Sequence, residues 1–91
     1  MTEYPFPDIG HTVSVSDEYK LNKNIPQFGI PEGSILEVKD IRRDPATINF
    51  YFSCTFPDDK EPTMDWDGNP VIFMKHHLKT FIETGDLERV E

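Results

Sequence analysis

The sequence of 91 residues contains a single cysteine, a single tryptophan and no long hydrophobic run. Because Cys54 has no partner for an intramolecular disulfide, the fold does not depend on an oxidising compartment, and we expect a cytoplasmic protein. No apolar stretch approaches the ~20 residues of a membrane helix. The N-terminus has neither the basic nor the apolar region of a signal peptide. We therefore expect neither secretion nor membrane insertion.

Basic residues are also scarce. Nine lysines and arginines stand against 17 aspartates and glutamates, which gives a formal net charge of −8. Proteins that bind nucleic acid usually gather cations to neutralise phosphates, but the only adjacent basic pair here is Arg42-Arg43. An acidic surface repels phosphates and anionic membranes and attracts basic protein surfaces. We expect a partner protein with a basic surface, and no direct contact with nucleic acid or membrane.

Short β-strands dominate the predicted structure, because eight prolines and five glycines divide the sequence into short pieces. Residues 1–9, with Pro5 and Pro7, are expected to form an extended arm rather than a regular element. Residues 10–91 are expected to form one domain, in which residues 17–32 make a long polar connection. Five strands are predicted, at residues 12–16, 34–41, 48–56, 71–74 and 87–90.

The clearest periodicity lies in the predicted strand 48–56. Every second residue from Ile48 to Phe56 is apolar, as expected of a long half-buried strand. Cys54 falls on the apolar positions of this strand, which indicates a small buried hydrophobic side chain rather than a reactive thiol. Apolar residues at helical spacing within residues 76–82 predict a helix of at most two turns, which Gly85 is placed to end.

The order of these elements resembles that of small SH3-like barrels. Two stretches carry the resemblance: Ile30-Pro31-Glu32-Gly33-Ser34-Ile35-Leu36-Glu37-Val38, which is similar to the Pro-x-Gly-x-hydrophobic-x-hydrophobic approach to the second strand, and a helical turn before Leu87-Glu88-Arg89-Val90. The resemblance implies an all-β, five-stranded SH3-like barrel with one short helical turn. It also implies an interaction module, a class that includes small proteins encoded by viruses of bacteria. The Ala-Leu-Tyr-Asp-Tyr segment and the paired tryptophans of the Pro-x-x-Pro-binding branch are absent.

Signatures of catalysis are missing from the sequence. It contains no Gly-x-Ser-x-Gly, Walker, His-Glu-x-x-His or Cys-x-x-Cys motif. A small filled barrel also offers little concave volume for a substrate. The neighbouring His76 and His77 point in different directions on a strand or a helix, so they cannot readily bind one metal ion together. We expect no enzyme activity, no cofactor and no metal site.

Most of the negative charge lies in two segments, residues 57–70 and residues 83–91. The first holds five acids and one lysine and the second holds four acids and one arginine, so together they carry −7 of the −8. In a barrel, the loop before the fourth strand and the C-terminal strand could lie on adjoining surfaces. The candidate partner-binding residues are Asp58, Asp59, Glu61, Asp65, Trp66, Asp67, Glu83, Asp86 and Glu88.

Three interpretations of the first acidic segment are open. Its Asp-x-Asp-Gly sequence partly matches a calcium loop, but that alignment puts Thr63 and Met74 at ligand positions. It could equally be a solvated turn, kept acidic for solubility. The sharper hypothesis is a partner-binding loop in which Trp66 and Met64 form an apolar anchor surrounded by carboxylates.

The favoured hypothesis is a non-enzymatic acidic module that docks on a basic region of another protein. If that region normally holds nucleic acid, the module would inhibit its target, with carboxylates standing in for phosphates, as a viral inhibitor of a host protein would. The alternative is a nucleic-acid-associated SH3-like module that uses Arg42, Arg43 and Tyr51. A structural subunit of a larger assembly is a third possibility.

Overall fold

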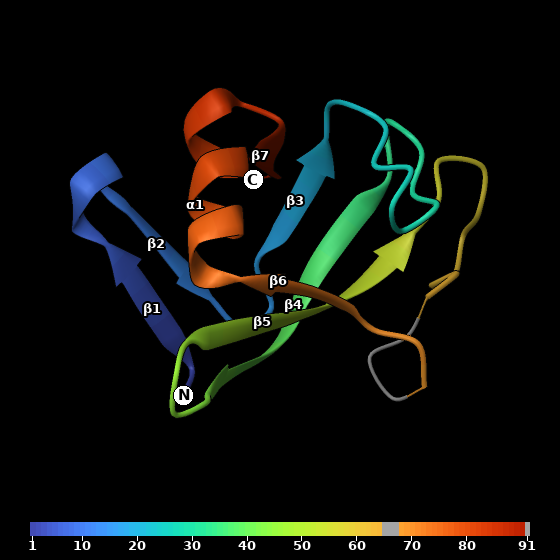
Figure 1. The fold of residues 1–91 in the computed structure, drawn as a ribbon. Helices are drawn as coiled ribbons and strands as arrows, with labels where there is room; N and C mark the ends of the chain where they lie inside the picture. The colour runs from blue at the N-terminus through green and yellow to red at the C-terminus, as the bar shows by residue number, and fades with distance from the viewer. Residues whose placement is uncertain (65–67, 91) are drawn as a thin grey trace.

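A computed structural model describes residues 1–64 and 68–90 and shows a predominantly β architecture (Figure 1). Within these residues there are seven strands, a short 3₁₀ turn and one α-helix. In chain order they are β1 Glu3–Phe6, the 3₁₀ turn Pro7–Ile9, β2 His11–Ser14, β3 Glu18–Leu21, β4 Ile35–Arg43, β5 Ile48–Thr55, β6 Val71–Met74, α1 Lys75–Thr84 and β7 Leu87–Val90.

Five of the strands form one antiparallel sheet in the order β6-β5-β4-β3-β7, and β1 pairs with β2 in a separate hairpin. The five-stranded sheet is strongly curled, and α1 links its two edge strands, β6 and β7 (Figure 1). The predicted fold class, a small all-β barrel-like domain with one short helix, is confirmed. The curl leaves a half-barrel, consistent with the SH3-like architecture that was expected.

The predicted strands at residues 34–41, 48–56, 71–74 and 87–90 are all present, as β4, β5, β6 and β7. On β5 the alternation is confirmed, since Phe50, Phe52 and Cys54 are fully buried. The predicted first strand is present as β2, but it pairs outside the main sheet.

Aromatic rings form the centre of the core. Phe52 contacts Tyr19 edge to face at 6.4 Å on one side and Phe73 at 5.4 Å on the other. Phe73 in turn meets Phe81 of α1 at 5.3 Å. Because edge-to-face pairs add to the free energy gained by burying the rings, this chain of contacts holds the helix against the curled sheet.

Two strands were missed by the sequence patterns. The expectation that residues 1–9 form an arm without a regular element is wrong, because residues 3–6 pair with β2. Pro5 is tolerated there because β1 pairs with a strand on one side only. On its open side, the missing N–H of a proline removes no hydrogen bond between strands. The expected polar connection 17–32 is also interrupted, by β3, whose four residues alternate exposed and buried.

The helix is longer than predicted. Its ten residues exceed two turns, because polar residues at both ends extend it beyond the apolar spacing. Leu78 is its fully buried residue. Gly85 ends the helix as expected, with a left-handed backbone (φ 84°) and its N–H bonded to the carbonyl of Ile82.

Candidate functional site

The first acidic segment leaves the end of β5 and is pinned at its base. The N–H of Cys54 donates to the carbonyl of Met64 at 2.8 Å, and the N–H groups of Thr63 and Met64 both donate to the carbonyl of Cys54. Within the loop, the hydroxyl of Thr63 donates to a carboxylate oxygen of Asp59 at 2.5 Å. Residues 56–64 are therefore a folded excursion from the sheet with one carboxylate used internally.

The other described carboxylates of this loop have no internal partner. Asp58 and Glu61 are exposed, and neither makes an ion pair or a side-chain hydrogen bond with any described residue. Both charges therefore face solvent. Of the predicted site, Asp65, Trp66 and Asp67 lie outside the described residues, so the predicted tryptophan anchor is not placed.

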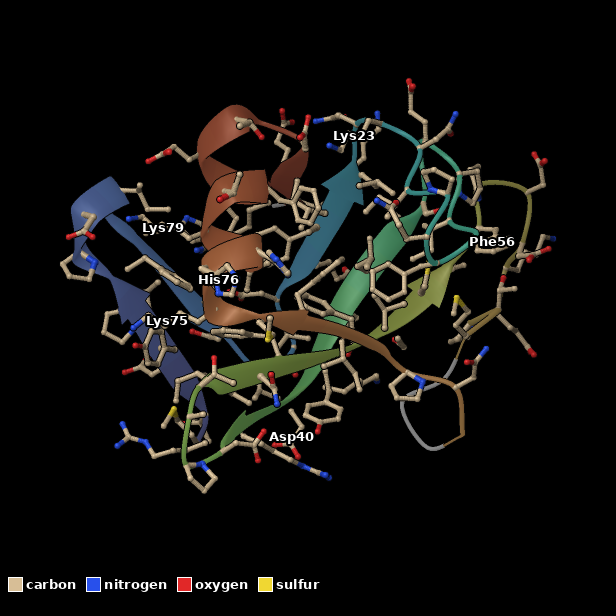
Figure 2. All side chains as sticks on the ribbon, viewed as in Figure 1. Lys23, Asp40, Phe56, Lys75, His76 and Lys79 are labelled. Atoms are coloured by element: carbon tan, nitrogen blue, oxygen red, sulfur yellow. The ribbon has the colours of Figure 1, made fainter. Side chains whose placement is uncertain are left out.

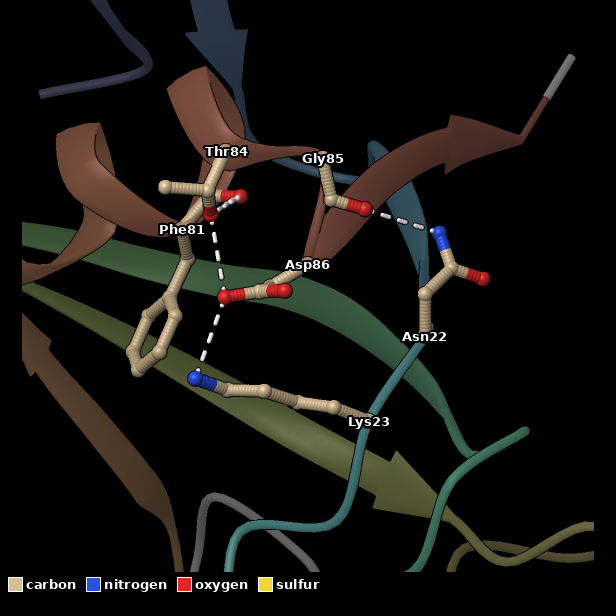
Figure 3. A network of polar contacts seen from close by, with 6 residues as sticks. All are labelled: Asn22, Lys23, Phe81, Thr84, Gly85 and Asp86. Atoms are coloured by element: carbon tan, nitrogen blue, oxygen red, sulfur yellow. Dashed lines mark hydrogen bonds and ion pairs between the residues drawn. The ribbon is translucent and has the colours of Figure 1, made fainter.

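The second acidic segment is tied into the fold (Figure 3). A carboxylate oxygen of Asp86 accepts a hydrogen bond from the hydroxyl of Thr84 at 2.9 Å and lies 3.0 Å from the ammonium of Lys23. Lys23 holds the pKa of Asp86 below its ordinary value, and the Thr84 hydroxyl adds to that effect. The Asn22 side chain donates to the carbonyl of Gly85 at 2.9 Å, which closes the network.

Glu83 and Glu88 are exposed and make no ion pair with the described residues, whereas Asp86 is half-buried. The second segment thus mixes one structural carboxylate with two solvated ones. Residues 22–33 lie between the two acidic segments. At one end Asn22 contacts Gly85 of the second segment, and at the other end Gly33 lies against Pro57 of the first. The two segments share one end of the sheet without a described contact between them.

The residues of the alternative nucleic-acid hypothesis are divided between two sides of the β4–β5 hairpin. Arg42 pairs with Asp40 at 2.7 Å and stacks over the ring of Tyr51 at 4.6 Å. Arg43, the next residue, lies instead in a cleft of about 510 Å³ that also contains Tyr4 and Lys75. A single platform of Arg42, Arg43 and Tyr51 is therefore not assembled.

A basic region that the sequence patterns did not single out lies at the start of α1. Lys75 and Lys79 are on the opposite side of the molecule from Phe56, where the acidic loop begins (Figure 2). The Lys75 ammonium lies 5.6 Å from the centre of the Tyr4 ring, and Lys79 pairs with Asp8 at 3.1 Å. The sequence did contain a signal for this region, because the first turn of α1 starts with Lys75 and contains no acidic residue. Lys75 and Lys79 are therefore remote from the start of the acidic loop, and the charge of Lys79 is offset by Asp8.

The remaining chemistry-bearing side chains do not form a site in the described residues. Cys54 is fully buried, and burial raises the pKa of its thiol, which disfavours the reactive thiolate. The ring centres of His76 and His77 lie 4.2 Å apart, with the two ring planes tilted by 58°. Within residues 1–64 and 68–90, no group of three His, Cys, Asp or Glu is arranged to hold a metal ion.

Among the described residues, no helix has the length and the apolar character that crossing a membrane requires.

Comparison with known proteins adds no relative. No protein-family model, no curated protein and no solved structure matches this chain.

Proposed function

We propose that the chain is a non-enzymatic protein-binding module whose acidic loop between β5 and β6 docks on a basic surface of another protein. The observation that carries the proposal is the pair of exposed carboxylates, Asp58 and Glu61, on a loop whose base is pinned by the hydrogen bonds of Cys54. Charges held on an ordered loop lose less conformational freedom on binding than charges on a disordered tail. They also speed the encounter with a basic partner.

The proposed target surface is one that normally binds nucleic acid. There, carboxylates take the places of phosphates, and the module inhibits by occupying the site. A viral origin and a cytoplasmic setting belong to the same proposal, since a compact acidic inhibitor with one buried cysteine suits a reducing compartment. The position of Lys75 supports an oriented approach, because this cation lies on the far side of the molecule from the start of the acidic loop (Figure 2).

The proposal is tested by capture from a cell extract with matched charge variants. In the first variant Asp58, Asp59 and Glu61 become lysine. In the control, three exposed acids elsewhere, Glu3, Glu18 and Glu32, become lysine, so the two variants have the same net charge. Loss of the main partner from the loop variant alone is the expected result. Retention by the loop variant, or equal loss from both, contradicts docking through this loop.

Direct binding to nucleic acid separates the proposal from its alternative. An acidic mimic has no measurable affinity for DNA or RNA at moderate salt. Affinity that falls steeply with salt would contradict the proposal, because such a dependence reports phosphate contacts by lysine and arginine. Lys75 and Arg43, which share one cleft, are the residues to replace if that result is found.

A further inference from the structure

The two edge strands of the five-stranded sheet, β6 and β7, are protected to different degrees. An edge strand exposes unpaired backbone N–H and C=O groups, which natural proteins guard with charged side chains. β7 carries Glu88 and Arg89, both exposed. β6 has the sequence Val-Ile-Phe-Met, with no charge, and its Ile72 and Met74 side chains are 38% and 37% exposed. In the described part of the chain, β5 is the only strand that pairs with β6.

An apolar pocket lies beside β6. Its volume is about 270 Å³, and its apolar lining comes from Ile72 and Phe73 of β6, Phe81 of α1 and Phe28 from the segment between β3 and β4. Ile25, Gln27 and His77 complete the lining. The ring of Phe73 forms the base, in edge-to-face contact with Phe28 at 5.6 Å and with Phe81 at 5.3 Å. Phe28 remains 40% exposed although it contacts the core. Large exposed aromatic and aliphatic side chains beside an edge strand are typical of a binding surface.

The size of the pocket favours an anchoring side chain over a small molecule. Sites for small ligands usually have about 300–1,000 Å³, and this pocket is smaller. The nearby ammonium of Lys23 is neutralised by Asp86 and lies over the Phe81 ring at 5.0 Å (Figure 3). An apolar group entering the pocket therefore does not leave that cation unpaired.

Charge along β6 gives the surface a direction. Its first residue, Val71, follows the acidic loop that contains Asp58 and Glu61, whereas its last residue, Met74, leads directly into the basic Lys75. A strand bound along β6 would therefore have Lys75 at one end. At the other end it would approach the end of β5 from which the acidic loop leaves, because Val71 pairs with Phe52. Because every described strand pair in this protein is antiparallel, a partner strand running opposite to β6 would bring its own C-terminal end to the acidic loop.

We propose that β6 and its pocket bind an extended segment of the partner protein. This segment adds an antiparallel strand to the outer edge of β6, places one large apolar side chain beside Phe28, and carries basic residues C-terminal to that side chain. The inference rests on the proposed function, since the same acidic loop supplies the charge. A second copy of the chain fits less well, because each copy carries a net charge of −8 and the two would repel each other.

The test uses a labelled synthetic peptide in which a phenylalanine flanked by valines and threonines precedes a run of lysines. Ile72→Lys puts a charge on the β6 edge, and Val90→Lys is the matched control on β7, where Val90 is 42% exposed. We expect Ile72→Lys to weaken binding about tenfold or more and Val90→Lys to change it by less than about twofold. A peptide with the lysines moved to the N-terminal side should bind more weakly than the original.

In the peptide experiment, the inference would be overturned by no binding of the peptide, by equal effects of the two lysine variants, or by equal binding of the two peptides. Sedimentation that shows a dimer which Ile72→Lys disperses would overturn it in favour of self-association. The proposed function fails separately. If reversal of Asp58, Asp59 and Glu61 abolishes capture of the cellular partner while Ile72→Lys does not, the loop docks and the β6 site is wrong. If Ile72→Lys abolishes capture while reversal of the three loop acids does not, the β6 site is supported and docking through the loop is contradicted.

Discussion

The two acidic segments both carry an excess of negative charge, but their carboxylates have different structural roles. In the second, Asp86 is paired with Lys23 and Thr84, and Leu87 beside it is buried in the core. In the first, Asp58 and Glu61 point into solvent with no described partner. A carboxylate with an internal cation contributes to the fold, whereas one without remains available to another molecule. Both segments therefore keep two solvated carboxylates, Asp58 and Glu61 in the first and Glu83 and Glu88 in the second, but among the described residues only the second uses a carboxylate in an ion pair.

The largest difference between the segments is expected in stability. Leu87 is 2% exposed and lies opposite Leu21 across the β3–β7 pair. Leu87→Ala should lower the free energy of unfolding by about 2–5 kcal/mol, because it removes buried apolar volume and leaves a cavity. Asp58→Ala, in the first segment, should change it by no more than about 0.5 kcal/mol. Urea denaturation measures both, and similar losses in the two variants would contradict the division of roles.

A pair of glycines sharpens the same comparison at the backbone. Gly85, in the second segment, has a φ of 84°. An added methyl group at Gly85, or at Gly68 in the first segment, would meet no described atom within 4 Å. Gly85→Ala should cost about 1 kcal/mol through backbone strain alone. Gly68→Ala should leave the melting temperature unchanged or slightly raised. Equal melting temperatures for the two variants would show that the helix end is not held in this conformation.

A smaller effect is expected from the ion pair itself. Lys23→Met keeps the side chain over Phe81 and removes the charge, so the free energy of unfolding should fall by no more than about 1 kcal/mol. Because Lys23 lowers the pKa of Asp86, the pair stabilises the fold above the unfolded carboxyl pKa, and this contribution is lost as pH falls through the lowered pKa. Removing Lys23 should therefore flatten the acid limb of the stability profile. Lys60→Met, in the first segment, is the control and should leave that limb unchanged.

The half-buried His11 lies outside both acidic segments in the sequence and gives a separate test by pH. Nε2 of His11 lies 2.7 Å from the hydroxyl of Tyr19. Burial lowers the pKa of His11 below its ordinary value of 6.5, and Arg89 adds to the shift while Asp17 opposes it. The unfolded chain therefore binds this proton first, so stability should fall as pH drops from about 6.5 to the lower pKa of His11. In His11→Gln this decline should disappear, and its persistence would assign it to another group.

Strong local periodicity made part of the fold predictable. The alternation on β5 needs no information beyond neighbouring residues, because a strand with one face in the core must repeat with a period of two. Gly85 was similarly readable as the end of a helix. By contrast, β3 has only four residues, two of them charged, and its strand character depends on pairing with β4 and β7. Pairing between distant segments leaves little local signal, as the strand containing Pro5 also shows.

The candidate site was less predictable than the fold. The sequence locates Asp58 and Asp86 in acidic segments, but it cannot tell that Lys23, 63 residues before Asp86, neutralises one of them. The pocket at β6 depends on Phe28 and Phe81, which only the folded chain brings to the same strand. Phe28 contacts Phe73 across 5.6 Å between ring centres, yet it remains 40% exposed.

The most direct test of the central claim is an amide chemical-shift titration of the full chain with the lysine-rich peptide described above. The account predicts that the largest shifts fall in the acidic loop around Asp58 and Glu61 and along β6. Smaller shifts are expected at Asp86, whose charge is already paired, and none at Tyr51 in the β4–β5 sheet region. Shifts concentrated at Asp86 and Glu88, or at Tyr51, would contradict the claim that the loop between β5 and β6 is the docking surface.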